Sequence, residues 1–340
     1  MRIVHVVCSS GFAGVERSVA SVAPELACRG HEVTVLGGDP VAMRAELRDT
    51  EVTFLPAPTT PAAARELVGW SFPRPDVVHS HMTAADLAAV ASWPVVRAPL
   101  VSTLHFAQPR GRDPVRRTLY RALPPCFRAQ VAVSRFVADT CGTPTVVVPN
   151  GVPDPGPVDP VASRDPVVLV AQRLEQEKRT SLALEAWAAS GLASDGWRLA
   201  VAGRGSGLSA LGAHAHRLGV EDSVDFLGFV DDLRDRMRRA SVFLATAPGE
   251  PFGLSVVEAL ANGLPVLAAD GGAHREVLAG FPEQLFPVDD AHACANALRH
   301  LASDTAVRTT FAERGRCRYQ DRYTIGRQVD GLLDVYSRVR

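Results

Sequence analysis

The sequence predicts an α/β protein built from two doubly wound parallel-sheet domains. Short Val-rich runs alternate with helical stretches along the chain, which is the pattern of parallel strands joined by crossover helices. The length of 340 residues suits two hydrophobic cores, since a domain holds about 150 residues. A segment with five prolines, 151–166, interrupts the alternation near the middle. We therefore expect one domain on each side of this segment.

The first half begins with a strand, helix, strand unit. The apolar run 3–7 predicts a strand, 16–30 has helical periodicity that ends at Gly30, and 31–37 predicts the next strand. Further strand-like runs lie at 76–81, 99–105, 130–134 and 145–149. These runs assign residues 1–152 to an N-terminal domain.

The second half resumes the alternation after the proline-rich segment. Its strand-like runs, two of which continue into loops, lie at 166–174, 197–207, 223–230, 241–248 and 264–270. We place the linker or hinge at 153–166, the C-terminal domain at 167–323 and a final helix at 324–340. That helix carries an apolar stripe of Val329, Leu332, Leu333 and Tyr336.

Charge and cysteine usage exclude several classes of function. The formal net charge is −1, so no global field draws the protein to nucleic acid or to an anionic membrane. The six cysteines show no C-x-x-C spacing, which argues against a zinc ribbon or a disulfide framework. No window approaches the roughly 20 apolar residues of a spanning helix. The sequence indicates a cytoplasmic protein without nucleic-acid partners.

One loop contains the only lysine of the chain. All but one of the 36 basic residues are arginines, a bias typical of a GC-rich bacterial genome. Lys178 follows the strand-like run 166–174 and stands five residues after Arg173. A guanidinium and an ammonium together can neutralise a diphosphate. The alternative is a solvated turn in which Glu175 pairs with Arg179 at i,i+4.

Two glycine-rich loops follow strands. In the loop 8–14, Gly14 permits close approach of the backbone to a ligand, although glycines also serve plain turns. The loop AGRGSG, 202–207, begins a dinucleotide-binding pattern, with Asp225 at the spacing of the acidic residue. Leu208 stands where that pattern requires glycine or alanine, so NAD binding is disfavoured.

Two glutamates flank a short apolar run in GEPFGLSVVEALANGLPVLA, residues 249–268. Glu250 lies in a non-helical segment, and a carboxylate there can accept hydrogen bonds from both hydroxyls of a diol. Gly253 would open backbone N–H groups to a phosphate. Glu258 has a second interpretation, because with Ser255 it has the S-x-x-E form of a capping box. A ligand with a diol at each end and phosphates between them is a sugar nucleotide.

The segment around Glu250-x7-Glu258 resembles the signature of retaining glycosyltransferases of family 4, which have the GT-B fold of two Rossmann-like domains. Other matching segments follow in order: FAGVER (12–17), DVVHSH (76–81), VSTLH (101–105), VAVSRFVAD (131–139), VVVPNGV (146–152), AQRLEQEK (171–178), LAVAGRGS (199–206) and VDFLGFV (224–230). The match covers nearly the whole chain. It implies that the N-terminal domain is the acceptor side and that the final helix crosses back onto it.

The resemblance also implies a role for each matching residue. Arg173 and Lys178 would hold the donor diphosphate, Glu258 the ribose, and Glu250 the transferred sugar. The expected donor-binding residues are Gly14, Arg173, Lys178, Gly203, Phe229, Val230, Glu250, Phe252, Gly253, Leu254 and Glu258. The expected catalytic residues are Glu250, His105, Arg173 and Lys178, with His105 beside the donor sugar. This chain has Ala13-Gly14 where the family usually has two glycines.

The implied reaction is the transfer of a hexosyl group, with retention, from a UDP-, GDP- or dTDP-sugar to a hydroxyl of a natural product, glycan or lipid. No D-x-D occurs in the sequence, so we expect no metal ion and no other cofactor. A GT-B-fold epimerase and a non-catalytic sugar-nucleotide-binding protein are alternatives. Both share donor binding and differ in whether an acceptor is glycosylated.

A rival class is a zinc hydrolase. His79 and His81 would share one face of a strand, and His105 ends another strand, so the three imidazoles are candidate zinc ligands. Histidines on buried strands commonly only satisfy hydrogen bonds, and zinc leaves the segment around Glu250 unexplained. We therefore expect no metal at these residues.

An arginine-rich stretch, 109–128, has six arginines from Arg110 to Arg128 against one aspartate. Its basic character fits peripheral docking on the inner face of an anionic membrane, and the alternative is a solvated helix face. Acceptor specificity should reside in the loops of 38–75 and 105–130.

Overall fold

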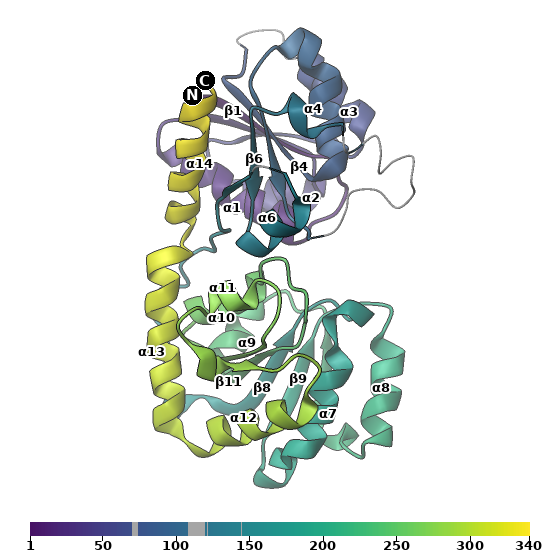
Figure 1. Ribbon diagram of the computed structural model, residues 1–340, viewed down its shortest axis with the longest axis vertical. Coiled ribbons are helices and arrows are strands. Elements are labelled where there is room, and N and C mark those ends of the chain that lie inside the picture. Colours follow the sequence, from purple (N-terminus) through teal and green to yellow (C-terminus); the bar gives the residue numbers. More distant parts are fainter. Residues whose placement is uncertain (70–73, 108–119, 121, 144) are drawn as a thin grey trace. The chain divides into compact units, whose positions relative to one another are not determined.

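The computed structural model describes residues 1–69, 74–107, 120, 122–143 and 145–340. The chain divides into two compact units (Figure 1). Unit 1 comprises Met1–Pro153 and Tyr323–Arg340, and unit 2 comprises Asp154–Arg322. Each unit is built on one parallel sheet. The two doubly wound domains predicted from the sequence are confirmed.

The sheet of unit 1 has the strand order β3-β2-β1-β4-β5-β6-β7 within the described residues, and all neighbours are parallel. Ile3 lies opposite Val33 on one side and Val77 on the other, so branched side chains form the centre of the sheet. The strands are β1 (Arg2–Val7), β2 (Glu32–Leu36), β3 (Thr53–Leu55), β4 (Val77–His81), β5 (Leu100–Leu104), β6 (Ala129–Ala132) and β7 (Val146–Val147).

Helices cover the sheet of unit 1. They are α1 (Gly14–Cys28), α2 (Pro40–Glu46), α3 (Thr60–Gly69), α4 (Met82–Val96), α6 (Arg135–Cys141) and α14 (Ile325–Val339), with a 3-10 turn η1 (Pro124–Cys126). The C-terminal helix α14 contacts α1 (Figure 1). Val329, Leu332 and Tyr336 of its apolar stripe belong to the same core cluster as residues of β1. Burial of each such side chain contributes about 1.5–3 kcal/mol.

The sheet of unit 2 has the order β10-β9-β8-β11-β12-β13, again with parallel neighbours throughout. Its strands are β8 (Asp165–Ala171), β9 (Arg198–Ala202), β10 (Val224–Gly228), β11 (Ala240–Ala245), β12 (Val266–Ala269) and β13 (Leu285–Phe286). Its helices are α7 (Thr180–Ser190), α8 (Leu208–Arg217), α9 (Leu233–Arg239), α10 (Leu254–Ala261), α11 (His274–Val277), α12 (Ala291–Ser303) and α13 (Thr305–Arg322). Trp187 of α7 is among the largest fully buried side chains of its core.

The segment 153–166, expected as a linker, belongs to unit 2 from Asp154 onward. The buried Arg164 guanidinium donates to the carbonyls of Met237 and Ala240 at the end of α9 and to that of Asn262, the C-cap of α10. These carbonyls have no intrahelical partner, so an arginine in the supposed linker completes two helix ends.

Both sheets reverse their strand order beside the first strand of the unit, between β1 and β4 and between β8 and β11. In such sheets the ligand crevice lies at the carboxyl ends of the strands next to the reversal. Two loops of unit 2, after β8 and after β11, have this position, and they contain Lys178 and Glu250.

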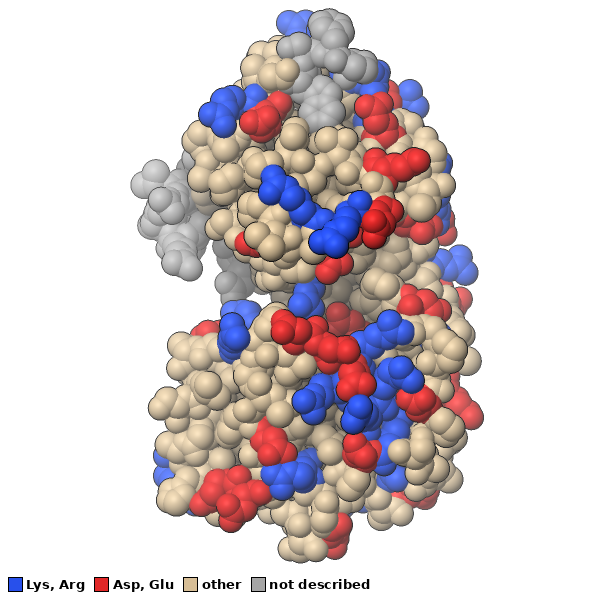
Figure 2. All heavy atoms as spheres, turned by 180° about the vertical axis from the view of Figure 1, so that it is seen from behind, with Lys and Arg blue, Asp and Glu red and all other residues tan. Residues whose placement is uncertain are grey.

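The surface of the described residues carries mixed charge. On the face shown in Figure 2, basic and acidic side chains are interspersed. No helix in these residues has both the length and the apolar character needed to cross a membrane. Most of the arginine-rich stretch 109–128, the expected membrane contact, lies outside the described residues.

Candidate active site

The structure brings Lys178 and Glu250 together at the carboxyl edge of the sheet of unit 2. Lys178 ends the 3-10 turn η3 (Gln176–Lys178), and its Nζ lies 2.6 Å from Oε2 of Glu250. Their side chains are 15% and 17% exposed. Burial acts to raise the pKa of Glu250, but the charge and hydrogen bond of Lys178 outweigh it and hold this pKa below its ordinary value. The carboxylate of Glu250 is therefore charged at neutral pH and forms an ion pair with Lys178.

Side chains that sequence reasoning missed hold the backbone of Lys178. The Gln172 amide donates to the carbonyl of Lys178 at 3.0 Å and to the hydroxyls of Thr180 and Thr246 at 2.9 and 3.1 Å. Thr246, just after β11, donates to the same carbonyl at 2.7 Å. Gln172 lies in the matched segment AQRLEQEK, but only the fold shows its long-range partner Thr246. The loops after β8 and β11 are thus tied together beneath the ion pair.

The helix α10 begins next to Glu250. Its N-cap is Gly253, with φ +94°, a left-handed conformation that favours glycine. Ser255 lies inside the helix, so the capping-box interpretation of Glu258 is wrong, and Glu258 stands in the second turn, partly exposed. The N-terminal amides of a helix and its dipole favour a bound anion. This helix start is therefore suited to a phosphate or a polar sugar.

His274 is a further buried group beside Glu250 that the sequence did not single out. It begins α11, is 1% exposed, and its Nδ1 lies 3.1 Å from the carbonyl oxygen of Ala269. Burial lowers the pKa of His274 although the charge of Glu250 acts to raise it. A Cβ at Gly272 would lie 2.5 Å from the carbonyl oxygen of Glu250, so the residue at 272 must be glycine. The only sequence signal for His274 is its place in GGAHREV, 271–277, a segment that closely follows the two glutamates.

Gly203, Gly205 and Gly207 allow their loop to pack closely against the backbone of residues 172–174. A Cβ at Gly203 would lie 1.9 Å from the carbonyl oxygen of Gln172, and one at Gly205 would lie 2.4 Å from that of Leu174. The carboxylate of Glu175 accepts from the backbone N–H and the hydroxyl of Ser206. These contacts account for the dinucleotide-like spacing without a dinucleotide.

Arg173 is not part of the ion pair. Its side chain is 62% exposed, and it pairs with Glu177 at 2.6 Å, while Arg179 pairs with Asp289 at 2.9 Å. The alternative pairing of Glu175 with Arg179 is therefore wrong. The guanidinium of Arg173 can reorient toward a ligand at small cost, because exposed ion pairs are weak.

Phe229 follows β10 and is 48% exposed. The guanidinium of Arg204 lies over its ring, 5.1 Å from the centroid. The next residue, Val230, is partly buried. Together these two side chains offer an apolar surface of the kind that borders a nucleobase.

Two of the predicted site residues belong to unit 1. Gly14 is the exposed first residue of α1, where the carboxylate of Glu16 turns back to accept from the backbone N–H of Ala13 at 2.9 Å and from the hydroxyl of Ser9 at 2.5 Å. His105 follows β5, and its Nε2 lies 3.1 Å from Nδ1 of His81. Burial lowers the pKa of His105 to about 4, so its imidazole is neutral at pH 7.

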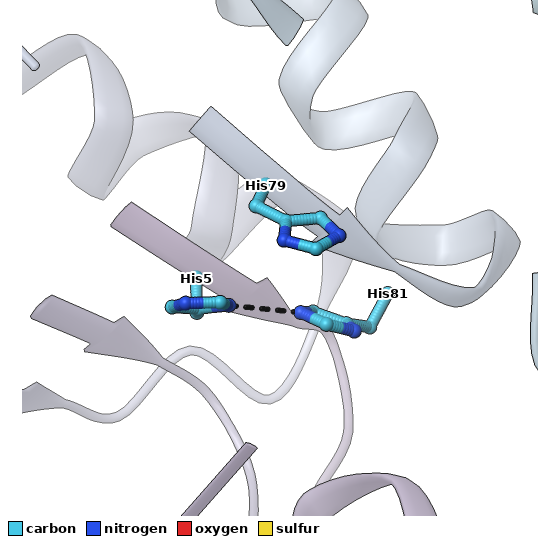
Figure 3. Close-up of side chains that lie close together, drawn as sticks. All are labelled: His5, His79 and His81. Atoms are coloured by element: carbon cyan, nitrogen blue, oxygen red, sulfur yellow. Dashed lines mark hydrogen bonds between the residues drawn. The ribbon is translucent and has the colours of Figure 1, made fainter. Parts of the chain in front are cut away.

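The histidines named as candidate zinc ligands, His79, His81 and His105, are grouped differently in the structure. Figure 3 shows His5, His79 and His81, whose ligating nitrogens all lie within 4.8 Å of one another among the described residues. His5 of β1, which sequence reasoning missed, therefore takes the place assigned to His105. Both nitrogens of His79 lie 2.6 Å from hydroxyl oxygens, those of Tyr336 and Thr103. These contacts are the hydrogen bonds of a buried polar strand residue.

Family models match both units. Residues 158–318 match the family described as glycosyl transferases group 1, and residues 12–154 match glycosyltransferase family 4. The phosphatidyl-myo-inositol mannosyltransferase of Mycolicibacterium smegmatis is 30% identical, over 92% of this chain and 88% of its own length. The lipopolysaccharide core biosynthesis mannosyltransferase LpsB of Rhizobium meliloti is 28% identical over 48% of this chain and 49% of its own.

Solved structures share the fold over the whole chain. Anabaena Alr3699/HepE in complex with UDP and glucose has a TM-score of 0.83 at 21% identity, covering 99% of both chains. A glycosyltransferase from Rickettsia africae also has a TM-score of 0.83, at 18% identity, covering 99% of this chain and 98% of its own. The fold is therefore GT-B, as the sequence resemblance implied. With the family matches and the 30% identical relative, this shows that the chain is a bacterial-type glycosyltransferase and belongs to glycosyltransferase family 4.

Proposed function

We propose that this glycosyltransferase is a retaining, metal-independent hexosyltransferase that uses a nucleoside-diphosphate sugar. The observation that carries the proposal is the pair of Lys178 and Glu250 beside the start of α10. An ammonium has three N–H donors, and Glu250 uses one, so Lys178 retains donors for a diphosphate. Glu250 then accepts from hydroxyls of the transferred sugar, and we assign the amides of Phe252, Gly253 and Leu254 to the same ligand, with the Phe252 amide also bonded to Glu250.

The remaining contacts follow the order of groups in a sugar nucleotide. Glu258 accepts from the ribose hydroxyls, Phe229 and Val230 border the base, and Arg173 leaves Glu177 to reach the diphosphate. The backbone of Gly203 lines the floor of the donor site. In unit 1 we assign Gly14 to the diphosphate and His105 to the transferred sugar.

Catalysis rests on stabilising the departing nucleoside diphosphate. Negative charge grows on the β-phosphate oxygen as the bond to the anomeric carbon breaks. Lys178 and the N-terminus of α10 are fixed before this charge develops, and such preorganised donors supply the largest share of many rate enhancements. Arg173 adds its charge after it has turned toward the bound diphosphate. The acceptor hydroxyl attacks from the same face, and its proton passes to the leaving phosphate oxygen, so the configuration is retained.

The names of the relatives guide the choice of substrates. Curated relatives are mannosyltransferases of a phosphatidylinositol lipid and of a lipopolysaccharide core, and a structural neighbour holds UDP and glucose. We propose a mannosyl or glucosyl donor carried on UDP, GDP or dTDP. We propose a lipid or glycan hydroxyl as acceptor, on the cytoplasmic side of a membrane contacted through the stretch 109–128.

Saturation-transfer NMR with UDP-, GDP- and dTDP-sugars tests the donor site. We expect one sugar nucleotide to bind selectively and Glu258→Ala to weaken its binding by about 10- to 150-fold, since a hydrogen bond between a ribose hydroxyl and a carboxylate contributes about 1.5–3 kcal/mol. Glu283→Ala, which removes a surface carboxylate paired with Arg314, is the matched control. Absence of binding across the panel would refute the proposal.

Two further measurements separate the finer claims. Transfer in the presence of EDTA should equal transfer without it, and loss of activity would contradict metal independence. The anomeric coupling constant of the product reports retention or inversion directly. Release of an epimerised sugar without an acceptor would identify the epimerase alternative instead.

A further inference from the structure

A small cavity with both polar and apolar side chains in its lining lies within unit 1, beneath the helices α1 and α14. Its volume is about 10 Å³, room for about one water molecule. Histidines of the sheet line one side, and Ser18, Asn150 and Gln328 line the other. The Gln328 amide donates to Oδ1 of Asn150 at 3.2 Å and accepts from the backbone N–H of Gly151 at 2.8 Å. The sheet face thus contains a polar network where an apolar core would be expected.

Three imidazoles form a chain through this network. Nδ1 of His5 lies 3.0 Å from Nε2 of His81 (Figure 3), and Nδ1 of His81 lies 3.1 Å from Nε2 of His105. The chain starts on β1, crosses β4 and ends just after β5. His5 is completely buried, whereas His105 is partly exposed. The chain therefore leads from the interior of unit 1 to its surface.

The three rings of the chain are neutral. Burial lowers the pKa of His5 and of His105 to about 4, and burial together with neighbouring histidines lowers that of His81 well below its ordinary value. A neutral imidazole has one N–H and one bare nitrogen. His81 takes part in both hydrogen bonds of the chain, so it must donate in one and accept in the other. The two bonds therefore point in the same direction along the chain.

We propose that His5 and His81 are positioning residues that hold His105 in one tautomer and one orientation through this hydrogen-bonded chain. In one direction all three rings carry the proton on Nδ1, and in the other all three carry it on Nε2. The chain occupies Nε2 of His105, so its polarity decides whether Nδ1 of His105 donates or accepts. The role of His105 at the sugar, and hence the kinetic part of the test, rests on the proposed function.

The free end of the chain makes a reversal of its polarity a concerted event. Nε2 of His5 is buried and has no hydrogen-bond partner among the described residues. An unsatisfied buried polar atom costs about 1–3 kcal/mol, unless a water molecule satisfies it. The adjacent cavity has room for one such water, which would donate to a bare nitrogen or accept from an N–H. A reversal of the chain then requires this water and all three rings to change together.

The same nitrogens argue against a metal ion in this cluster. Nδ1 of His5 and Nε2 of His81 are already hydrogen-bonded to each other. Both nitrogens of His79 are hydrogen-bonded to the hydroxyls of Tyr336 and Thr103. A metal would have to break one of those two bonds to gain a lone pair from His79. The ring of His79 instead stacks on His81, with centroids 4.4 Å apart and an interplanar angle of 29°.

The first test is ¹⁵N NMR of the histidine side chains in the unmodified protein at pH 7.5, without substrate. We expect His5, His81 and His105 to show the same tautomer. A chain with mixed tautomers would overturn the proposal. Addition of Zn²⁺ should leave the signals in place, and a joint shift of His5, His79 and His81 at stoichiometric Zn²⁺ would replace the chain with a metal site.

The second test compares His81→Phe with His79→Phe. Both residues are buried on the same face of β4, and a phenyl ring keeps the stack between them, so the two variants lose similar packing. Only His81→Phe breaks the chain, and we expect the ¹⁵N signals of His105 to move to averaged tautomer positions in that variant alone. An unchanged His105 would overturn the proposal.

Kinetics add a functional readout once a donor and an acceptor are known. His81→Phe should lower kcat about tenfold or more, because a wrongly protonated His105 meets the transferred sugar, while KM for the donor stays within about twofold. His79→Phe should leave the protonation of His105 unchanged. The NMR result is independent of catalysis, so a protein that transfers no sugar but has uniform tautomers refutes the proposed function and leaves the chain standing.

Discussion

The two units share a strand order, yet they bury polar groups at their sheets in opposite ways. In unit 2 a lysine and a glutamate are both charged and meet at 2.6 Å. In unit 1 four histidines and a tyrosine are all neutral, because burial holds the histidine pKa values low and raises that of Tyr336. A charged pair suits a ligand that brings phosphate charge, whereas a neutral network suits hydroxyl groups and fixed proton positions. The topology sets where such groups lie, and the side chains decide their chemistry.

The largest effect should come from removing the cation of unit 2. Lys178→Met takes away a donor aimed at the leaving diphosphate, and loss of one such donor typically costs about 10²–10³ in kcat. Arg179→Met is the matched control, because Arg179 is adjacent in sequence but 43% exposed and paired with Asp289. We expect steady-state transfer assays to show a change of less than about threefold for the control. Equal losses in the two variants would show that the loss is not specific to Lys178.

The second prediction concerns the energy of the pair itself. Removing one partner leaves a buried, unpaired charge, so Lys178→Met should destabilise the protein, while Lys178→Met combined with Glu250→Gln should recover part of the loss. A double-mutant cycle by urea unfolding should give a coupling energy of about 2 kcal/mol. A coupling near zero would mean that solvent already screens the pair.

The pH dependence of this pair has a defined sign. The folded pKa of Glu250 is lowered, so its stabilising contribution is present above the unfolded pKa and is lost as the pH falls through the folded value. Lys178→Met removes the main group that lowers this pKa, and burial, which raises it, is then opposed only by the weaker effects of His274 and the Phe252 amide. In that variant the unfolding free energy should fall as the pH rises through the range where Glu250 ionises, opposite to the behaviour of the native pair.

The third prediction tests the neutral network of unit 1. The pKa of His5 is lowered from 6.5 to about 4, so the unfolded chain binds the extra proton first as the pH falls. Stability is therefore complete above pH 6.5 and is lost between pH 6.5 and 4. When the pH falls from 7.5 to 5, this histidine should lower the free energy of unfolding by about 2 kcal/mol. Urea unfolding of His5→Phe should show a drop smaller by that amount, and an identical drop would place the proton uptake elsewhere.

The fold was more accessible from sequence than the contacts within it. Alternating apolar runs predicted the long strands and both domains, but not β3 and β13, which have three and two residues and no periodicity to detect. The prolines of the segment 153–166 predict a linker. The buried Arg164 that joins it to unit 2 acts on backbone carbonyls, which the sequence does not distinguish.

The site was predictable where a local pattern marked it. The two glutamates and the single lysine stood out, whereas Gln172 and Thr246 act across 74 positions and have no local signature. His5 was missed because one histidine in an apolar strand is usually a satisfied core residue. The register between β1 and β4 places His5 opposite His79 and within hydrogen-bond distance of His81. This register depends on how the two strands pair in the sheet.

The smallest effect should come from an exposed ion pair, which contrasts with the buried pair of unit 2. Arg29 of unit 1 lies after α1 and pairs with Asp330 of α14 at 2.6 Å, and the Asp330 side chain is 57% exposed. Although the hydrogen bond to Asp330 raises the pKa of Arg29, solvent screens such a pair, and Asp330→Asn should cost only about 0.5 kcal/mol. Thermal unfolding at low salt and at 1 M NaCl measures this cost, which should vanish at high salt. A loss above about 1 kcal/mol that persists in salt would mean that this contact, rather than the apolar stripe of α14, holds the helix over the histidine cavity.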